Sequence, residues 1–148
     1  MNRYFVGFLD YSKHIKPVLS VLKKWPRMEI GNITKYEPVL KGIKWFGMYK
    51  GHSIKDIVAL ASIEYDLKNK TIDLRQLNAG EKGIGRILMN NVIDWCKQNK
   101  NGCHELTWVA NPDGGEELKN YYRKNWPEAK ETEEKNPYWK TSRFTIKL

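Results

Sequence analysis

The most informative stretch of the chain joins a predicted strand to a predicted helix, and it reads Leu-Asn-Ala-Gly-Glu-Lys-Gly-Ile-Gly-Arg at residues 77–86. At the first turn of a helix, backbone N–H groups have no intrahelical acceptor and lie at the positive end of the helix dipole. Glycines at 80, 83 and 85 leave those groups uncovered. The stretch predicts a binding site for an anion such as a pyrophosphate, although a tight strand-to-helix turn alone would also use glycines.

Lys82 and Arg86 flank these glycines and would add positive charge beside the amides. The spacing excludes two known phosphate loops. A P-loop ends in Gly-Lys-Ser/Thr, whereas Gly85 is followed by Arg86 and Ile87. The dinucleotide-binding fingerprint requires a further glycine at position 88, which is leucine here.

The hydrophobic period predicts the elements on either side of this stretch. Before the glycines we expect strands and a helical region, at 4–9 (strand), 12–25 (helix), 27–42 (short helix or loop), 44–49, 57–63 and 71–77 (strands), with a turn at 68–70. After them we expect a helix to about residue 99 with Gly102 just past its end, and strands at 105–110 and 138–148. Asp113 and Glu116 resemble a capping box that opens another helix. Residues 128–136 are polar and are predicted as a surface loop.

The composition is that of one compact α/β domain spanning residues 1–148. Hydrophobic residues make up 41% of the chain, and six Trp and eight Tyr supply large groups for a core. No apolar stretch approaches the roughly 18 residues that a bilayer span requires. The N-terminus lacks the features of a signal peptide, and two cysteines exclude a disulfide scaffold. We therefore expect a cytoplasmic protein that makes no membrane contact.

The net charge of +9 is concentrated in the first third of the chain. Residues 1–55 hold eleven basic and three acidic residues, whereas 56–99 hold six of each. Residues 100–148 hold nine basic and eight acidic residues. A segregated excess of this kind indicates a face that meets an anionic partner. A lysine-rich solvated surface is an equally weighted interpretation.

Three segments resemble the GNAT superfamily of acyl-CoA-dependent N-acyltransferases. Residues 80–85 match its phosphate loop, Gln/Arg-x-x-Gly-x-Gly/Ala, at both glycines, but Gly80 replaces the usual Gln or Arg. Residues 57–63 resemble the family's third strand. Residues 121–126 resemble its late aromatic-Tyr motif, although Trp126 and Pro127 replace the usual Gly-Phe and the Asn-x-x-Ala signature is absent. The order of predicted elements is also that of the family.

The resemblance implies a fold and an activity. The fold would be a mixed, mostly antiparallel sheet of about six to seven strands, flanked by helices and splayed between its two central strands. The activity would be N-acetyl transfer from acetyl-CoA, a co-substrate, to a primary amine, by direct attack in a ternary complex and without a metal. The protein would be a monomer or a homodimer.

The resemblance also assigns roles to individual residues. Leu77 and Asn78 would offer main-chain groups to the pantetheine arm, and Asn111 would lie on the other side of the cofactor. Lys82, Gly83, Ile84, Gly85 and Arg86 would hold the pyrophosphate. Tyr122 would be the general acid that protonates the CoA thiolate. Tyr121 is adjacent to it, and a core aromatic residue is the alternative interpretation of Tyr122.

Glu64 is the first candidate for the base that accepts the amine proton, and Asp73 is the second, although both could be ordinary surface carboxylates. The three histidines are far apart and no zinc-ligand spacing occurs, while Cys96 is expected to be a small buried residue. The basic first third favours an acidic acceptor, such as a charged tRNA, a ribosome- or nucleic-acid-associated protein, or an anionic small molecule. Two alternatives remain: a non-catalytic nucleic-acid-binding module, or a degenerate GNAT protein that only binds CoA.

Overall fold

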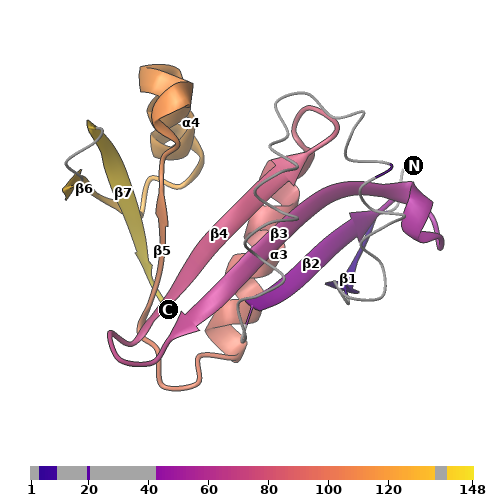
Figure 1. Cartoon of the computed structure of the whole chain (residues 1–148), viewed down its shortest axis with the longest axis horizontal. Helices are drawn as coiled ribbons and strands as arrows, with labels where there is room; N and C mark the ends of the chain where they lie inside the picture. Colours follow the sequence, from indigo (N-terminus) through magenta and orange to yellow (C-terminus); the bar gives the residue numbers. More distant parts are fainter. Residues whose placement is uncertain (1–3, 10–19, 21–42, 136–139) are drawn as a thin grey trace. The chain divides into compact units, whose positions relative to one another are not determined.

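The structure is a computed structural model that describes residues 4–9, 20, 43–135 and 140–148 (Figure 1). The helix predicted within 12–25 and the segment 27–42 lie outside the described residues. So do the basic side chains of this region on which the expected basic face depends, namely Lys13, Lys16, Lys23, Lys24, Arg27, Lys35 and Lys41.

Seven strands form one mixed sheet in the order β1-β2-β3-β4-β5-β7-β6. Their bounds are Phe5–Leu9 (β1), Ile43–Tyr49 (β2), Ile57–Asp66 (β3), Thr71–Ala79 (β4), Glu105–Val109 (β5), Lys130–Lys135 (β6) and Lys140–Lys147 (β7). The pairs β1–β2, β2–β3, β5–β7 and β6–β7 are antiparallel, whereas β4–β5 is parallel. The predicted α/β class, with a mixed and mostly antiparallel sheet, is confirmed.

The two central strands, β4 and β5, pair over a short length. Their ladder joins residues 71–73 of β4 to residues 105–107 of β5. β4 nevertheless continues to Ala79 and β5 to Val109. Residues 74–79 of β4 are therefore outside this ladder.

Backbone packing divides the chain into two compact units. The first comprises residues 1–64 and 75–95, and the second comprises residues 65–74 and 96–148. The first unit thus holds the predicted phosphate loop, and the second holds Asn111 and Tyr122.

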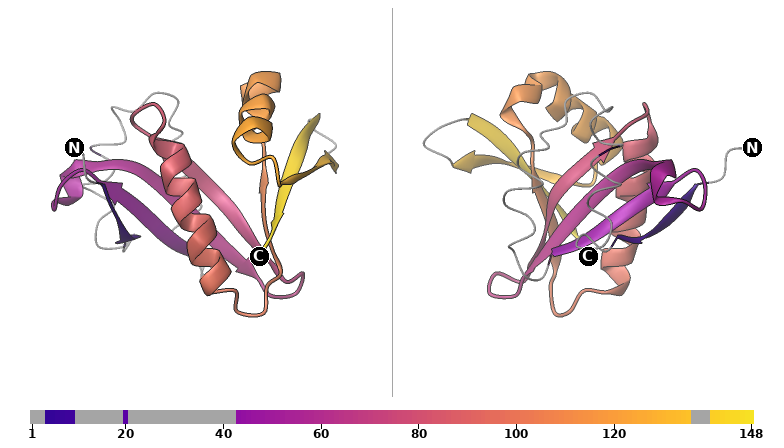
Figure 2. Two further views of the ribbon diagram at one scale, coloured as in Figure 1. Left: turned by 180° about the vertical axis from the view of Figure 1, so that it is seen from behind. Right: turned by 45° about the vertical axis from the view of Figure 1, so that its right-hand side comes forward.

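In the first unit, helix α3 (Ile84–Gln98) runs along one face of β2 and β3 (Figure 2). Its residues Ile84, Leu88 and Val92 recur at four-residue steps and are all buried. Near the other end of the helix, the ring of Trp95 makes edge contacts with Phe46 of β2 at 5.3 Å and with Phe8 of β1 at 5.6 Å between centroids. The apolar stripe predicted from the sequence therefore fixes α3 on the sheet.

The core of the second unit is a group of aromatic rings. The rings of Trp108 and Phe144 are stacked, with 5.7 Å between centroids and 13° between planes. Trp126, at the end of helix α4 (Gly115–Asn125), meets the Trp108 ring edge-on at 6.0 Å. Leu106 and Ile146 are buried beside each other in paired strands. Strands β5 and β7 therefore present the face on which α4 packs.

The prediction of a loop at 128–136 is wrong, because residues 130–135 form the strand β6. β6 pairs with β7 over six residues, from Lys130 opposite Thr145 to Lys135 opposite Lys140. Its polar sequence has no buried apolar alternation to reveal a strand. Ion pairs stabilise it instead, because Glu131 and Glu134 bind Arg123 and Arg143 respectively.

The predicted capping box of Asp113 and Glu116 is also wrong. The side chain of Asn111 caps a 3-10 turn at Pro112–Gly114 by accepting a hydrogen bond from the Asp113 amide at 3.0 Å. Helix α4 then begins at Gly115 without a side-chain cap. Asn111 takes this position because its short amide reaches the amide two residues ahead, as in an Asx-turn.

Gly102 lies in a turn of its own rather than in a helix cap. Helix α3 ends at Gln98, and the turn at residues 100–103 is closed by a hydrogen bond from the Cys103 amide to the Lys100 carbonyl at 2.8 Å. Asn101 and Gly102 both have positive φ, at 49° and 83°. This is the Asn-Gly pattern of a type I′ turn.

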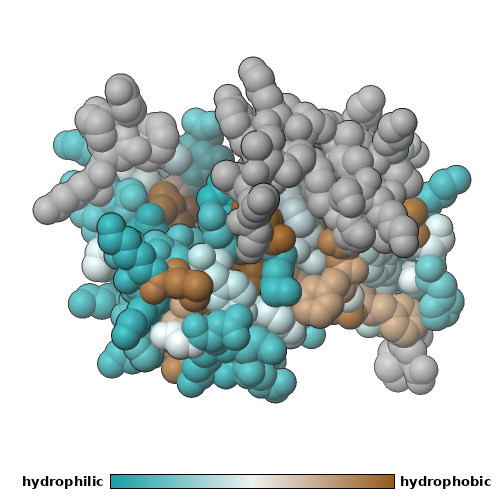
Figure 3. Space-filling view, turned by 60° about the horizontal axis from the view of Figure 1, so that its bottom comes forward, coloured by the Kyte–Doolittle hydropathy of each residue, from teal (hydrophilic) through white to brown (hydrophobic). Residues whose placement is uncertain are grey.

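Hydrophobic residues are interspersed among hydrophilic ones on the face drawn in Figure 3. Phe5 and Phe8 of β1 and Leu67 in the β3–β4 turn are the most exposed large hydrophobic residues of the described chain. Among the described residues, no helix has both the length and the apolarity needed to cross a lipid bilayer.

Replacing Leu106 with alanine tests the core of the second unit. The Leu106 side chain is fully buried, so Leu106→Ala is expected to lower the free energy of unfolding by about 2–5 kcal/mol. Leu67→Ala is the matched control, because Leu67 is 65% exposed and its loss is expected to cost less than about 0.5 kcal/mol. Urea denaturation followed by circular dichroism measures both, and equal losses would contradict this description of the core.

Candidate functional site

The phosphate loop predicted from the sequence connects β4 to α3 within the first unit. β4 ends at Ala79 and α3 begins at Ile84. The Gly80 amide donates a hydrogen bond of 2.8 Å to the Val58 carbonyl of β3, so the beginning of the loop is fixed to the sheet. The loop therefore leads directly to the N-terminus of α3, a helix with one buried face.

Gly83 has a backbone conformation that favours glycine, with φ at 85°. A Cβ atom there would meet nothing within 4 Å, so the space beside this residue is open. At Gly85, a Cβ atom would lie 3.5 Å from that of Ala79, an ordinary contact. Gly83 is thus required by the turn, and it leaves room for a ligand to approach the main chain.

Lys82 and Arg86 are exposed on either side of this turn. Neither side chain makes an ion pair or a hydrogen bond to the residues that the structure describes. Together with the first-turn amides of α3, they supply positive charge that an anionic group can neutralise. This arrangement can bind a phosphate or pyrophosphate group.

Sequence reasoning missed one residue that contacts the loop, Lys50. Its Nζ atom forms an ion pair of 2.5 Å with Oε1 of Glu81, and this hydrogen bond raises the pKa of Lys50. The carboxylate of Glu81 is thereby paired next to the glycines, where an unpaired negative charge would repel an anion. The two residues are 31 positions apart, so no local pattern could have indicated the contact.

Leu77 and Asn78 lie near the end of β4 and are both half-buried. The side-chain amide of Asn78 donates to Oε1 of Gln76 at 3.1 Å. Both residues lie outside the β4–β5 ladder, which ends at Asp73. Their main-chain groups are not used by that pairing.

The two candidate bases lie in different units and have polar partners. Glu64, at the end of β3 in the first unit, accepts a hydrogen bond of 2.9 Å from Nη1 of Arg75. Asp73, in the part of β4 that belongs to the second unit, accepts a hydrogen bond of 3.3 Å from the Thr71 hydroxyl. Protonation of Glu64 would remove its negative charge and weaken this ion pair with Arg75.

Tyr122 lies in the aromatic core of the second unit. Its ring contacts Phe144 at 5.2 Å and Trp108 at 5.7 Å between centroids, and it also lies near Tyr121 and Trp126. Burial raises the pKa of Tyr122 to about 12, with a smaller contribution from Tyr121. The Tyr122 hydroxyl makes no hydrogen bond within the described part of the chain. Tyr121 is more exposed than Tyr122.

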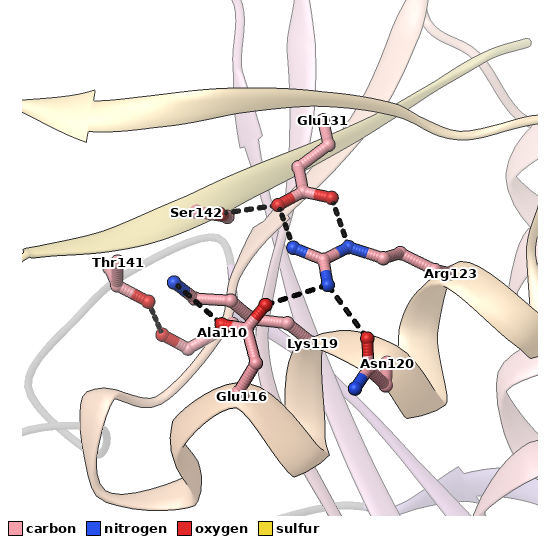
Figure 4. A network of polar contacts seen from close by, with 8 residues as sticks. All are labelled: Ala110, Glu116, Lys119, Asn120, Arg123, Glu131, Thr141 and Ser142. Atoms are coloured by element: carbon pink, nitrogen blue, oxygen red, sulfur yellow. Dashed lines mark hydrogen bonds and ion pairs between the residues drawn. The ribbon is translucent and has the colours of Figure 1, made fainter.

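A network of polar contacts surrounds the residue that follows Tyr122 (Figure 4). Nε and Nη2 of Arg123 donate to the two carboxylate oxygens of Glu131 at 2.6 and 2.8 Å. Nη1 donates to Glu116 at 2.9 Å and to Asn120 at 2.7 Å. The Ser142 hydroxyl donates to Oε2 of Glu131 at 2.7 Å. The network joins α4 to both β6 and β7, and sequence reasoning did not predict it.

The two cysteines contribute no reactive group to the candidate site. Cys96 and Cys103 are both buried, and burial raises the pKa of Cys96 to about 12, so neither is a reactive thiolate. The prediction that Cys96 is a buried residue on its helix is confirmed. In the described chain, no three His, Cys, Asp or Glu side chains gather as metal ligands would.

Comparison with known proteins relates one segment of this chain to a described family. The family model described as the acetyltransferase (GNAT) family matches residues 79–126, which run from the end of β4 through the phosphate loop to α4. Searching the curated proteins gave no match. Residues 79–126 therefore match the GNAT acetyltransferase family, and the resemblance inferred from the sequence is confirmed.

Solved structures share the fold over nearly the whole chain. An N-acetyltransferase from Staphylococcus aureus Mu50 is similar with a TM-score of 0.74 and 14% identity, covering 98% of this chain and 97% of that one. A candidate ribosomal-protein-serine acetyltransferase from Vibrio cholerae is similar with a TM-score of 0.66 and 11% identity, covering 100% and 95%. A spermidine/spermine N-acetyltransferase from Vibrio cholerae gives a TM-score of 0.66 and 11% identity, covering 98% and 92%.

The ion pair between Arg123 and Glu131 is expected to make the free energy of unfolding depend on pH in the acid range. Hydrogen bonds from Arg123 lower the pKa of Glu131 to about 2, from an ordinary value of 4.5. The stabilisation is therefore complete above about pH 4.5 and is lost as the pH falls towards 2. Glu131→Gln is expected to lower the melting temperature at pH 7 and to make its decline between pH 5 and 2 shallower.

Thermal denaturation across this pH range measures the effect. Glu133→Gln is the matched control, because Glu133 is on the same strand and its side chain has no ion pair within the described residues. An unchanged acid slope in Glu131→Gln would show that the pair does not contribute to the pH dependence.

Proposed function

We propose that the protein is an N-acetyltransferase that moves an acetyl group from acetyl-CoA to a primary amine by direct attack in a ternary complex. The observation that carries this proposal is the loop before α3. It combines a glycine in the left-handed region, open space beside it and two exposed basic side chains at a helix N-terminus. It also lies within the segment that matches the family.

The loop suits the diphosphate of CoA for a physical reason. Amides at a helix N-terminus donate hydrogen bonds to phosphate oxygens without a charged side chain in between. We assign this contact to Gly83, Ile84, Gly85 and Arg86, with additional charge from Lys82. Leu77 and Asn78 would bind the pantetheine arm through main-chain groups of β4. In the second unit, the side-chain oxygen of Asn111 accepts a hydrogen bond from the Asp113 amide. The other polar groups of Asn111 would be the ones to contact the cofactor.

We assign the general acid to Tyr122. A tyrosine hydroxyl is protonated at neutral pH, and the raised pKa of Tyr122 leaves it so, which means that the proton is present when the carbon–sulfur bond breaks. The proton then passes from the phenol oxygen to the departing sulfur, and solvent reprotonates the tyrosinate. In the first half of the reaction, Glu64 would accept the proton of the attacking amine directly or through water, with Asp73 as the second candidate.

We infer that the acceptor is anionic or carried by an anionic molecule in the cytoplasm. The charge of the first 55 residues supports this inference, with eleven basic and three acidic side chains. A ribosome-associated acceptor agrees with the description of one similar structure, whereas another similar structure acts on spermidine, a polycation. The charge of the acceptor is therefore tested separately from the acetyl transfer.

Binding of acetyl-CoA tests the phosphate loop. At a ligand concentration 100 times Kd, the wild type is expected to gain about 2.7 kcal/mol, or roughly 5–10 °C in melting temperature. Gly83→Asp is expected to abolish this gain, because a carboxylate beside the amides repels the pyrophosphate. Gly102→Asp is the matched control, since Gly102 also has a positive φ of 83° and nothing within 4 Å of a Cβ atom.

Three outcomes separate the candidate functions. Loss of the shift in Gly83→Asp with retention in Gly102→Asp supports the proposal. Indifference of the wild type to acetyl-CoA, with salt-sensitive binding of RNA, would support the nucleic-acid-binding module instead. Binding of CoA without any acetyl transfer would support the degenerate GNAT protein, which the Gly80 departure favours.

Removing the Tyr122 hydroxyl tests the general acid. Tyr122→Phe is expected to lower kcat by about 100-fold to 10,000-fold, because proton transfer to the leaving thiolate is lost. Its stability should change little, since the hydroxyl has no hydrogen bond within the described residues. Tyr121→Phe is the control. Release of the CoA thiol measures kcat, with two peptides as acceptors that share a free N-terminal amine but carry either acidic or basic side chains.

The acidic peptide is expected to be the better acceptor. A stronger reaction with the basic peptide would contradict the inference about the acceptor. It would not affect the assignment of Tyr122 as the general acid. Full activity of Tyr122→Phe would remove Tyr122 from the mechanism.

A further inference from the structure

Helix α4 is joined to the β6–β7 hairpin by one polar contact set that adjoins the residue assigned as the general acid. We call the side chains of Arg123, Glu131 and Ser142 the α4 anchor (Figure 4). Both carboxylate oxygens of Glu131 accept from Arg123, at 2.6 and 2.8 Å, and one also accepts from Ser142 at 2.7 Å. Three elements of the second unit therefore meet at one carboxylate.

The geometry of the α4 anchor distinguishes it from an ordinary surface ion pair. Isolated surface pairs contribute little to stability, but bidentate pairs within a network are the exception. Arg123 is further oriented by Glu116 and Asn120, which both lie on α4 and accept from Nη1. The guanidinium is thus fixed to its own helix before it reaches across to β6.

Aromatic ring contacts also join α4 to the strands. Tyr122 meets Trp108 and Phe144 through ring contacts at 5.7 and 5.2 Å. Ring contacts tolerate several relative positions, and the Tyr122 hydroxyl has no hydrogen bond within the described residues to hold it. The position of the phenol oxygen is therefore set by the position of the helix backbone.

Proton transfer makes that position important. A displacement of about 1 Å from the productive geometry can cost on the order of 100-fold in rate. Directional hydrogen bonds can hold a helix to this precision, whereas apolar packing of a ring is less restrictive. The α4 anchor supplies such bonds at the residue next to Tyr122.

We propose that Arg123 and Glu131 are positioning residues for acetyl transfer, because their bidentate contact fixes α4 and thereby the Tyr122 hydroxyl relative to the β6–β7 hairpin. The inference rests on the proposed function of Tyr122. It predicts that breaking the contact lowers kcat and leaves KM for acetyl-CoA unchanged.

The chain offers a matched control for this proposal. Glu134, also on β6, forms a similar two-bond contact with Arg143, through Nε at 2.8 Å and Nη2 at 3.2 Å. Arg143 is on β7 and reaches Thr107 of β5, so its pair joins strands to one another and does not involve α4. Glu134→Gln therefore removes an ion pair of the same type from the same strand without releasing the helix.

The experiment measures kcat and KM with acetyl-CoA and the acidic peptide for Glu131→Gln, Glu134→Gln, Tyr122→Phe and the double variant Glu131→Gln/Tyr122→Phe. We expect Glu131→Gln to lower kcat by roughly 10-fold to 100-fold, with KM for acetyl-CoA within about twofold of the wild type. Glu134→Gln should stay within about twofold in both parameters. In the Tyr122→Phe background, Glu131→Gln should cause no further loss, because the group that it positions is already absent.

Two results would overturn the proposal: an equal loss of kcat in Glu134→Gln and Glu131→Gln, or a full multiplicative loss in the double variant. Glu131→Asp and Arg123→Lys, checked by circular dichroism, replace Glu131→Gln if it does not fold. Glu131→Asp keeps the carboxylate and should recover part of the rate.

The parallel Tyr122→Phe measurement distinguishes a failure of the positioning role from a failure of the proposed function. If Tyr122→Phe is inactive and Glu131→Gln is fully active, only the positioning role is wrong. If the wild type transfers no acetyl group, or Tyr122→Phe is fully active, the proposed function fails and the positioning role fails with it.

Discussion

The packing of α3 against β2 and β3 is the constraint on which the phosphate loop depends. Ile84, Leu88 and Val92 bury one stripe of the helix, and this burial fixes the helix in position and direction. The N-terminus then follows the end of β4 after four residues, with Gly80 hydrogen-bonded to β3. The amides at the N-terminus of α3 are thus placed by the hydrophobic core, and the glycines before them permit the turn and leave open space beside it.

In the second unit, different interactions hold the helix α4 in position. Its helix α4 is amphipathic, but none of its residues is fully buried. Aromatic rings cover one side of the helix, and the bonds of the α4 anchor hold the other side to the hairpin. Burial raises the pKa of Tyr122, while the polar network joins its helix to β6 and β7. Each unit therefore combines a core that positions an element with exposed groups that can carry out chemistry.

The sequence predicted those features whose signals are local. The helical period of α3 and the glycines before it lie within about 20 consecutive residues, so both the helix and its loop could be identified. The charged strand β6 could not, because its six residues lack apolar alternation and its stabilising partners Arg123 and Arg143 lie on other elements. The pair of Lys50 and Glu81 was missed for the same reason, since only the fold brings these residues together.

The cap of the turn before α4 could not be predicted from the sequence for a different reason. Asp113 and Glu116 have the spacing of a capping box, yet Asn111 provides the cap two residues earlier. Both residue types can accept such a hydrogen bond, and the choice depends on the backbone of Gly114 and Gly115. Local spacing identifies a set of candidates in such cases, and the conformation of the neighbouring glycines selects among them.

The charged character of β6 has a consequence for the behaviour of the protein at high concentration. β6 is the last strand in the order of the described sheet, so one row of its main-chain groups faces no other described strand. Such an edge can pair with a strand of a second molecule and start aggregation. Lys130, Glu131, Glu133 and Glu134 put charges along this edge, and bringing them against another chain would require their desolvation. The same residues that make this strand hard to recognise in the sequence thereby disfavour pairing of its edge with another strand.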